Sequence, residues 1–240
     1  LRWTSQGDAL TMDPHSQNEG PTIAMNGQIY ESLVTRDANL DLQPELAESW
    51  TAGSDGWTFN LRRNVKFHDG ADFTAEDVVF SFERAKHEAS DYKEQAKNVV
   101  SVEVIDDYTV KLVTNGPNPI LPNQLTSIYM MDKNWAEANN VVAPQDFKAE
   151  QETFAVRNAN GTGPFILKSR APDEMTVLTK NDNWWGAGKF PGNVDTIEYR
   201  PITNAATRVA ALLSGEVDFV LDPPLQDLKR IQAAEGLGTK

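Results

Sequence analysis

Three histidines, His15, His68 and His87, are the side chains best suited to acid–base chemistry or metal binding near neutral pH. They lie far apart in the sequence and fall in segments with different expected structures. The sequence contains neither an HExxH zinc-binding pattern nor a GxSxG nucleophile elbow, and it has no cysteine. Because catalysis requires several such groups to converge, we expect no catalytic residue, no metal ligand and no cofactor.

Two glycine-rich segments could in principle cradle a phosphate. In the first, Asn160 to Phe165, Pro164 and a predicted strand follow the glycines, whereas a phosphate loop leads into a helix N-terminus. The second, Gly186 to Lys189, lacks the Ser or Thr and the spacing of a P-loop. We therefore interpret both segments as turns.

The composition excludes several classes of protein. The 240 residues carry a formal net charge of -13, which argues against nucleic acid as a partner and against adsorption to an anionic membrane. No cysteine is available for disulfides or thiolate chemistry. No apolar run approaches the length that spans a bilayer, so we expect no membrane insertion. The opening residues, LRWTSQGD, lack the basic and apolar regions of a signal peptide.

Local patterns predict a strand, a turn and a capped helix between residues 57 and 85. Trp57, Phe59 and Leu61 alternate with polar residues, as in a half-buried strand, and Val65 and Phe67 continue the alternation. The sequence His68-Asp69-Gly70 then favours a turn. Thr74 and Asp77 have the spacing of an N-cap and its reciprocal partner, and Val78, Phe82 and Ala85 follow at helical spacing.

Other segments are assigned more coarsely. We expect a helix from about Thr22 to Leu33 with Ile23, Tyr30 and Leu33 facing inward, and a second helix from Asn204 to Leu213 that stops at Gly215. Trp50 and Trp57 should be core residues, whereas the adjacent Trp184 and Trp185 should point to opposite sides. The predicted strands, joined in one case by a hairpin turn at Asp106-Asp107, cover residues 2–4, 99–105, 109–114, 165–168, 195–200 and 216–220.

Seven stretches together resemble one known family. They are LAESW, WTFNLR, NVKFHDG, TAEDVVFSFERA, GTGPF, NDNWWG and TRVAALLSGEVDF. Their order is similar to that of the extracytoplasmic solute-binding proteins of family 5, which serve peptide-type ABC importers and include dipeptide-, oligopeptide- and nickel-binding proteins. The resemblance extends over nearly the whole chain, from the opening segment to VDFVLDPP.

This resemblance implies an α/β fold, the two-lobed clamshell of type II periplasmic binding proteins. Since members of the family are much longer, the chain corresponds to the first lobe only. Residues 1–38 and 161–240 would form the main body of that lobe, and residues 39–160 an inserted smaller subdomain. The second lobe and a C-terminal return segment would be absent, and with them most of the groups that clamp the solute.

The function implied by the resemblance is solute capture without catalysis. The solute would be small, a peptide in the first instance, and the partners would be the permease and ATPase subunits of an ABC importer. The location would be the periplasm, or the cell exterior for a membrane-anchored lipoprotein of a Gram-positive host, with the signal peptide outside this chain. Two alternatives stay open: another solute, such as a nickel chelate, sugar, opine or glutathione, or a secreted hydrolase.

Solutes in such a clamshell contact loops at strand ends, where backbone groups and short polar side chains are free. Two segments of the chain fit that description, although both could also be plain surface loops. The candidate ligand-binding residues are Ser16, Gln17, Asn18 and Glu19 in the first segment and Thr126, Ser127 and Tyr129 in the second.

Overall fold

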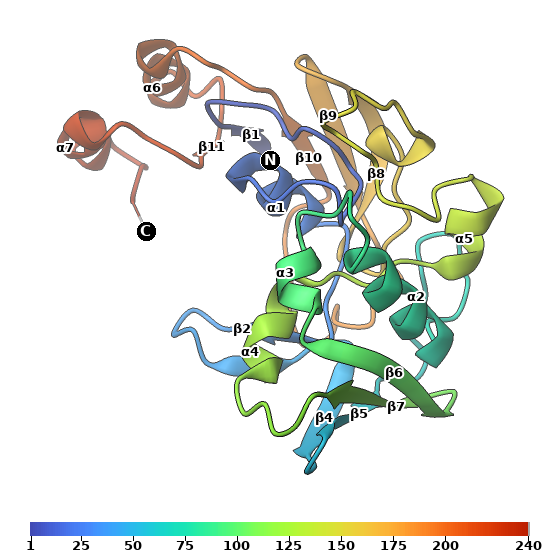
Figure 1. Cartoon of the computed structure of the whole chain (residues 1–240). Coiled ribbons are helices and arrows are strands. Elements are labelled where there is room, and N and C mark those ends of the chain that lie inside the picture. Colours follow the sequence, from blue (N-terminus) through green and yellow to red (C-terminus); the bar gives the residue numbers. More distant parts are fainter. Residues whose placement is uncertain (240) are drawn as a thin grey trace.

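A five-stranded mixed sheet forms the body of the molecule in the computed structural model, which describes residues 1–239 (Figure 1). The strand order is β11-β1-β10-β9-β8. β1, the second strand from one edge, runs parallel to both of its neighbours, and the remaining pairs are antiparallel. The strands are β1 (Arg2–Thr4), β8 (Phe165–Ala171), β9 (Met175–Lys180), β10 (Thr196–Tyr199) and β11 (Phe219–Val220).

A second, antiparallel sheet has the order β4-β5-β7-β6 and lies at the opposite end of the molecule (Figure 1). Its strands are β4 (Ala47–Ala52), β5 (Gly56–Leu61), β6 (Val99–Asp106) and β7 (Thr109–Thr114). The helix α2 (Ala75–Ala85) packs against β6 and β7. Phe59, Leu61, Val78 and Phe82 are buried in the core between them, as the alternation and the helical spacing predict.

The beginning of α2 confirms the predicted capping box. The backbone N–H of Thr74 donates to Asp77 Oδ2 at 2.9 Å, while Thr74 itself has the extended backbone of an N-cap residue. The predicted ends of α6 (Ala205–Leu213) are confirmed as well. The Asn204 side chain accepts a hydrogen bond from the Thr207 N–H, and Gly215 has a φ of 74° just after the helix.

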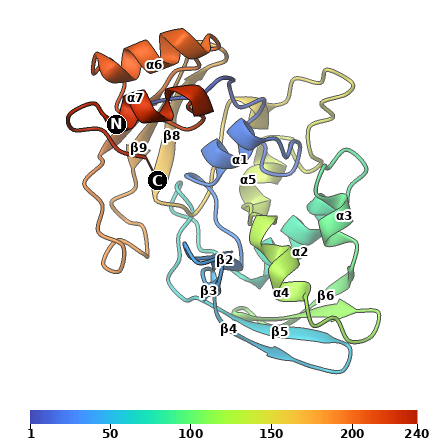
Figure 2. The ribbon, with the colours of Figure 1, turned by 90° about the vertical axis from the view of Figure 1, so that its left-hand side faces the viewer.

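Shorter elements connect the two sheets. The hairpin β2–β3 forms its own two-stranded sheet. It spans residue 38, after which the first predicted domain segment was expected to end. The predicted division of the chain into a main body and an inserted subdomain stays a prediction. The α-helices α6 and α7 lie at the far end of the five-stranded sheet from β4 and β5 (Figure 2). The remaining elements are α1 (Gly20–Asn26), β2 (Val34–Arg36), β3 (Leu42–Pro44), α3 (Lys93–Ala96), α4 (Leu121–Gln124), α5 (Lys133–Ala138), α7 (Leu228–Gln232) and short 3₁₀ turns at 125–127, 154–156 and 225–227.

The glycine-rich segment after Asn160 is a turn, as interpreted from the sequence. A Cβ atom on Gly161 would lie 2.0 Å from the carbonyl oxygen of Ile29, and one on Gly163 would lie 2.7 Å from it. The N–H of Gly163 donates to that same oxygen at 2.8 Å. The glycines therefore permit a close approach between two backbones, which leaves the phosphate-loop interpretation without support.

Four predictions about elements are wrong in part. α1 ends at Asn26 and not near Leu33, and Ile23 is 40% exposed. Trp50 and Trp57 are only half-buried at the edge of the core, where the Trp57 indole N–H donates to the Asn118 carbonyl. β11 has two residues where five were expected, and β9 was not predicted at all.

Among residues 1–239, no helix is both long and apolar enough to cross a bilayer.

Candidate functional site

A buried ion pair anchors the first candidate segment to the helix α2. The Arg84 guanidinium, on α2, donates to both Asp13 carboxylate oxygens at 2.6 Å, and both side chains are fully buried. The Asp13 carboxylate also accepts the N–H groups of His15 and Gln145. Although burial acts in the opposite direction, Arg84 holds the pKa of Asp13 below its usual value. These contacts therefore fix the backbone immediately before the segment that begins at Ser16.

His15 extends this network to the second candidate segment. Its Nδ1 lies 3.2 Å from Arg84 Nη1, which is always a donor, so Nδ1 must accept and Nε2 must carry the proton. Nε2–H then donates to the Tyr129 carbonyl at 2.9 Å. Burial, followed by the adjacent Arg84 charge, lowers the pKa of His15 to about 3. His15 is consequently a neutral structural bridge at physiological pH.

The residues of the first segment differ in how far they are available to a ligand. Ser16 is fully buried, and its hydroxyl donates to the Gln145 carbonyl. Glu19 is the N-cap of α1 and accepts from the Thr22 N–H. Gln17 is half-buried and Asn18 is exposed; Asn18 donates to the Asp91 carbonyl at 3.4 Å. Gln17 and Asn18 thus present the most accessible polar side chains of this segment.

The second segment lies beside the first because of the His15 bridge. Tyr129 pairs with Ser32 in an isolated antiparallel bridge, and its ring stacks near Tyr30 with a centroid separation of 6.3 Å. Thr126, Ser127 and Tyr129 are half-buried. The structure therefore brings together two predicted segments that are more than a hundred residues apart in the chain. Whether they contact a solute stays a prediction.

Tyr92 is buried beneath the first candidate segment and was not predicted. Its hydroxyl donates to the Gln17 carbonyl at 3.4 Å, and its ring lies edge-on to His15. Burial raises the pKa of Tyr92, and Tyr129 and Glu19 contribute in the same direction. No local sequence pattern pointed to Tyr92, since its neighbours lie in two other segments, at residues 15–19 and at Tyr129.

A second unpredicted cluster surrounds Glu31. The indole N–H groups of Trp184 and Trp185 both donate to its carboxylate, at 2.9 Å to the nearest oxygen in each case, and the Thr162 hydroxyl donates at 2.8 Å. The two tryptophans therefore converge on one acceptor, and the prediction that they point to opposite sides is wrong. Glu45, whose carboxylate bonds the N–H and hydroxyl of Ser32, lies close by.

His68 hydrogen-bonds the glycine-rich turn at 160–164, and not the His68-Asp69-Gly70 turn that contains it. Its Nε2 lies 3.0 Å from the Gly163 carbonyl, and its backbone N–H donates to the Gly161 carbonyl. The ring thereby joins the turn that precedes α2 to the turn before β8. Within residues 1–239, no three His, Cys, Asp or Glu side chains are grouped so as to hold a metal ion.

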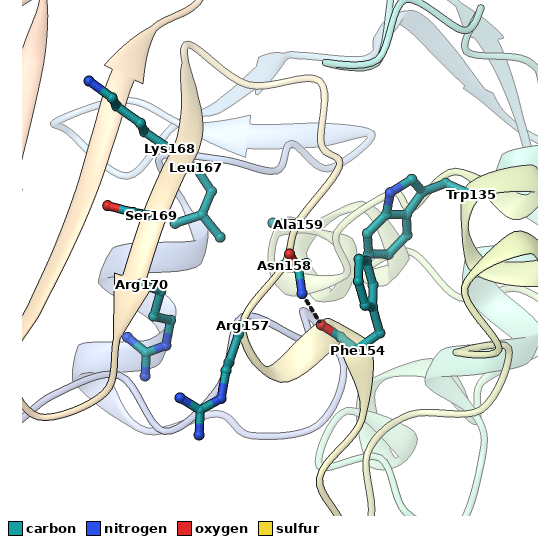
Figure 3. A pocket seen from close by; sticks show the side chains of 9 residues that line it. All are labelled: Trp135, Phe154, Arg157, Asn158, Ala159, Leu167, Lys168, Ser169 and Arg170. Atoms are coloured by element: carbon teal, nitrogen blue, oxygen red, sulfur yellow. Dashed lines mark hydrogen bonds between the residues drawn. The ribbon is translucent and has the colours of Figure 1, made fainter.

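One open cavity of about 350 Å³, lined by none of the candidate residues, lies between β8 and two short helical segments, α5 and the 3₁₀ turn at 154–156 (Figure 3). Trp135 and Phe154 form an aromatic wall, and Asn158 donates to the Phe154 carbonyl at 2.9 Å. Arg157 pairs with Glu152, and Arg170 pairs with Asp8. Both guanidinium groups that line the cavity therefore already have acidic partners. We assign no ligand to this cavity.

The fold and the comparison with known families define the class of protein. Residues 41–239 match the model of the bacterial extracellular solute-binding proteins, family 5. The chain therefore belongs to this family, as its sequence motifs suggested. Its fold is that of the type II periplasmic binding proteins, of which it contains one part.

Individual relatives show how large that part is. The glutathione-binding protein GsiB of Salmonella choleraesuis is 30% identical over 220 residues, which are 90% of this chain and 41% of the relative. The DppA periplasmic binding protein of Helicobacter pylori, solved in complex with the peptide STSA, is 28% identical with a TM-score of 0.84. AgaA of A. tumefaciens R10, solved with agropinic acid, is 26% identical with a TM-score of 0.85. The structural match covers 97% and 98% of this chain, but only 48% and 46% of the two solved chains.

Proposed function

We propose that the protein containing this chain is the extracytoplasmic solute-binding component of an ABC importer, that its solute is a peptide, and that it catalyses no reaction. The observation that carries the proposal is the match to a peptide-bound periplasmic binding protein over nearly the whole chain. The proposed partners are a membrane permease and ATPase subunits. The proposed location is the periplasm, or the outer surface of a Gram-positive cell.

The mechanism would be closure of two lobes around the solute. A solute that contacts both lobes stabilises the closed state relative to the open one and so shifts the population. This chain would supply one wall of the cleft: the exposed part of the segment 16–19 together with Tyr129 and its neighbours. The buried Asp13–Arg84–His15 network supports this assignment, because a binding surface works best when rigid packing holds it in place.

The second candidate is the same clamshell with another solute. Glutathione is named for one relative and agropinic acid for another. The choice between these solutes depends on groups that face the ligand from the second lobe as well as from this one. A hydrolase has less support, since the relatives named above are binding proteins.

Calorimetry on the full-length protein tests the proposal. Dipeptides, tripeptides and longer peptides should bind saturably, whereas glutathione and agropinic acid should bind more weakly. Tyr129→Ala and Asn18→Ala should each weaken peptide binding by about tenfold, the effect of losing one or two hydrogen bonds or a packed ring. Asn39→Ala, an exposed substitution in the β2–β3 turn, serves as the control.

Two results would contradict the proposal. If glutathione or agropinic acid bound and no peptide did, the peptide assignment would be wrong while the importer assignment survived. If peptides bound equally well to the Tyr129 and Asn18 variants, the two segments would not form the cleft wall.

A further inference from the structure

A second cavity, of about 430 Å³, lies between the β2–β3 hairpin and the loop that follows Asn181. Its volume falls within the usual range for small-molecule sites. Two carboxylates, those of Glu31 and Glu45, line it together with the rings of Trp184, Trp185 and Phe190. It includes none of the residues predicted to face the solute, so it is a separate feature of the molecule.

Glu31 is buried and Glu45 is half-buried, and neither carboxylate has a salt-bridge partner among the described residues. The three groups that donate to Glu31 are neutral, and neither Glu31 nor Glu45 forms an ion pair within residues 1–239. Glu45 uses Oε2 for both bonds to Ser32, which leaves Oε1 without a hydrogen-bond partner in the described part of the chain. Burial raises the pKa of each group to about 7, and for Glu31 the nearby Glu45 adds to the effect.

The aromatic wall of the cavity already attracts cations. The Arg62 guanidinium carbon lies 3.9 Å from the ring centroid of Trp185, and the Lys189 ammonium lies 5.1 Å from that of Phe190. Trp184 and Phe190 lie side by side, with centroids 5.9 Å apart. Rings and carboxylates around one cavity are the groups that proteins use to hold organic cations, since the ring faces are electron-rich and the carboxylate supplies the charge.

We propose that this cavity binds a compact organic cation, a guanidinium or alkylammonium group, with Glu45 Oε1 as its hydrogen-bond acceptor. A metal ion is disfavoured as the ligand, because the described residues bring no three metal-ligating side chains together there. The cation can come from a free amine or from the side chain of a basic peptide, which presents the same chemistry.

The charges around the cavity predict a competitor. Arg36 also lines it, but its guanidinium donates to the Leu40 carbonyl and to Asn123. Asp37 lines it as well and accepts from backbone groups and Gln43. Lys189 is exposed and has a flexible side chain, so its ammonium can turn toward Glu45. Replacing Lys189 should therefore strengthen binding of an external cation.

Nitrogen-edited NMR of the 240-residue chain gives a local readout, since each of the six tryptophans contributes one indole N–H signal. Titration with methylguanidinium, at constant ionic strength adjusted with sodium chloride, should move the Trp184 and Trp185 signals saturably and leave the other four in place. Glu45→Gln should weaken binding by about tenfold or more, because hydrogen bonds to a charged acceptor are the strong ones. Lys189→Met should strengthen it, and Glu103→Gln, an exposed change on β6, should have no effect.

The four distant indole signals also report whether each variant is folded, so loss of binding can be separated from loss of structure. A blocked Ala-Arg-Ala peptide, titrated in parallel, shows whether the side-chain source also enters. Equal binding to wild type and Glu45→Gln, or a shift that rises linearly without saturation, would overturn the proposal. The cavity lies wholly within this chain, so failure of the cation proposal would leave the two-lobed solute mechanism untouched. Failure of the solute mechanism would likewise leave the cation proposal untouched.

Discussion

At the scale of single residues, Arg84 carries a charge into the interior and is matched there by Asp13 alone. Its Nη2 and Nε atoms also donate to the Ala143 and Val141 carbonyls, so every part of the guanidinium is used. Arg84→Met would leave the Asp13 carboxylate buried without its partner. We expect a loss of roughly 3–5 kcal/mol in the free energy of unfolding, measured by urea denaturation.

The matched control is Arg157→Met, which breaks an ion pair in which both side chains are more than half exposed. Pairs of that kind contribute little, so its urea midpoint should stay close to that of wild type. Similar losses in the two variants would mean that the buried pair does not hold the 16–19 segment in place.

His15 gives the fold a dependence on pH with a defined sign. The folded pKa is lowered to about 3, whereas an unfolded histidine titrates near 6.5, so between these values the unfolded state binds more protons. Stability from this residue is therefore complete above pH 6.5 and decreases as the pH falls toward 3. Each pKa unit corresponds to about 1.4 kcal/mol.

The experiment compares wild type with His15→Gln, which cannot titrate. The stability advantage of wild type, measured by urea denaturation, should be largest at pH 8 and shrink steadily between pH 6.5 and pH 4.5. An advantage that stayed constant over this range would show that His15 does not bury a neutral ring. The charged groups facing it, Asp13 and Arg84, are the same in both proteins.

Little of the residue-level site could be predicted from the sequence. Gln17, Asn18 and Tyr129 were found as polar or aromatic residues in loops, but the links among them pass through His15 and Tyr92. Glu31 shows the difficulty most clearly, since its donors Thr162 and Trp184 are more than 130 residues away. A local sequence pattern does not indicate partners so far away in the chain.

At the scale of secondary-structure elements, prediction succeeded where the local signal and the tertiary packing agree. β5 shows the period-2 alternation and α2 has both its capping box and an apolar face. α1 shows the opposite case. Beyond Gly27, the carbonyls of Gln28 and Ile29 accept hydrogen bonds from Phe165 and Gly163, so the backbone leaves the helix to pair with a distant turn.

A substitution in α2 tests the importance of its apolar face. Phe82 has no exposed surface, and its truncation to alanine should cost about 3–5 kcal/mol of unfolding free energy. Trp57→Ala should destabilise less, because half-buried Trp57 loses less contact area. Val104→Ala, on the exposed side of β6, should be nearly neutral.

Thermal unfolding of the three variants, followed by circular dichroism, gives the order of stabilities directly. For the full-length protein, none of the three changes should alter which solute binds. An unchanged melting temperature for Phe82→Ala would be incompatible with the buried core between α2 and the four-stranded sheet.

At the scale of the whole molecule, the chain spans about half the length of its solved relatives or less. A clamshell holds its solute from two sides, which removes water from the polar contacts and strengthens them. We therefore expect the 240-residue chain to bind peptide on the order of a hundredfold or more weakly than the full-length protein, since three or four hydrogen bonds would be lost.

Calorimetry with the same peptide against both forms measures this ratio. Submicromolar binding of equal strength by the two forms would mean that one lobe carries recognition alone. The apolar side chains around β11, among them Phe219 and Leu221, are partly exposed and make self-association a variable to monitor by light scattering.

The position of β1 also has a consequence for the order of folding. β1 lies between β11 and β10 in the five-stranded sheet, so Trp3 pairs with Tyr199 and Phe219, close to the other end of the chain. Contacts between residues so far apart form slowly, because the long loop between them must first be closed. The strands of the four-stranded sheet all lie within residues 47–114, so shorter loops separate them and they can pair early. We therefore expect a growing chain to complete the small sheet first and to close the large one only after residue 220 has been synthesised.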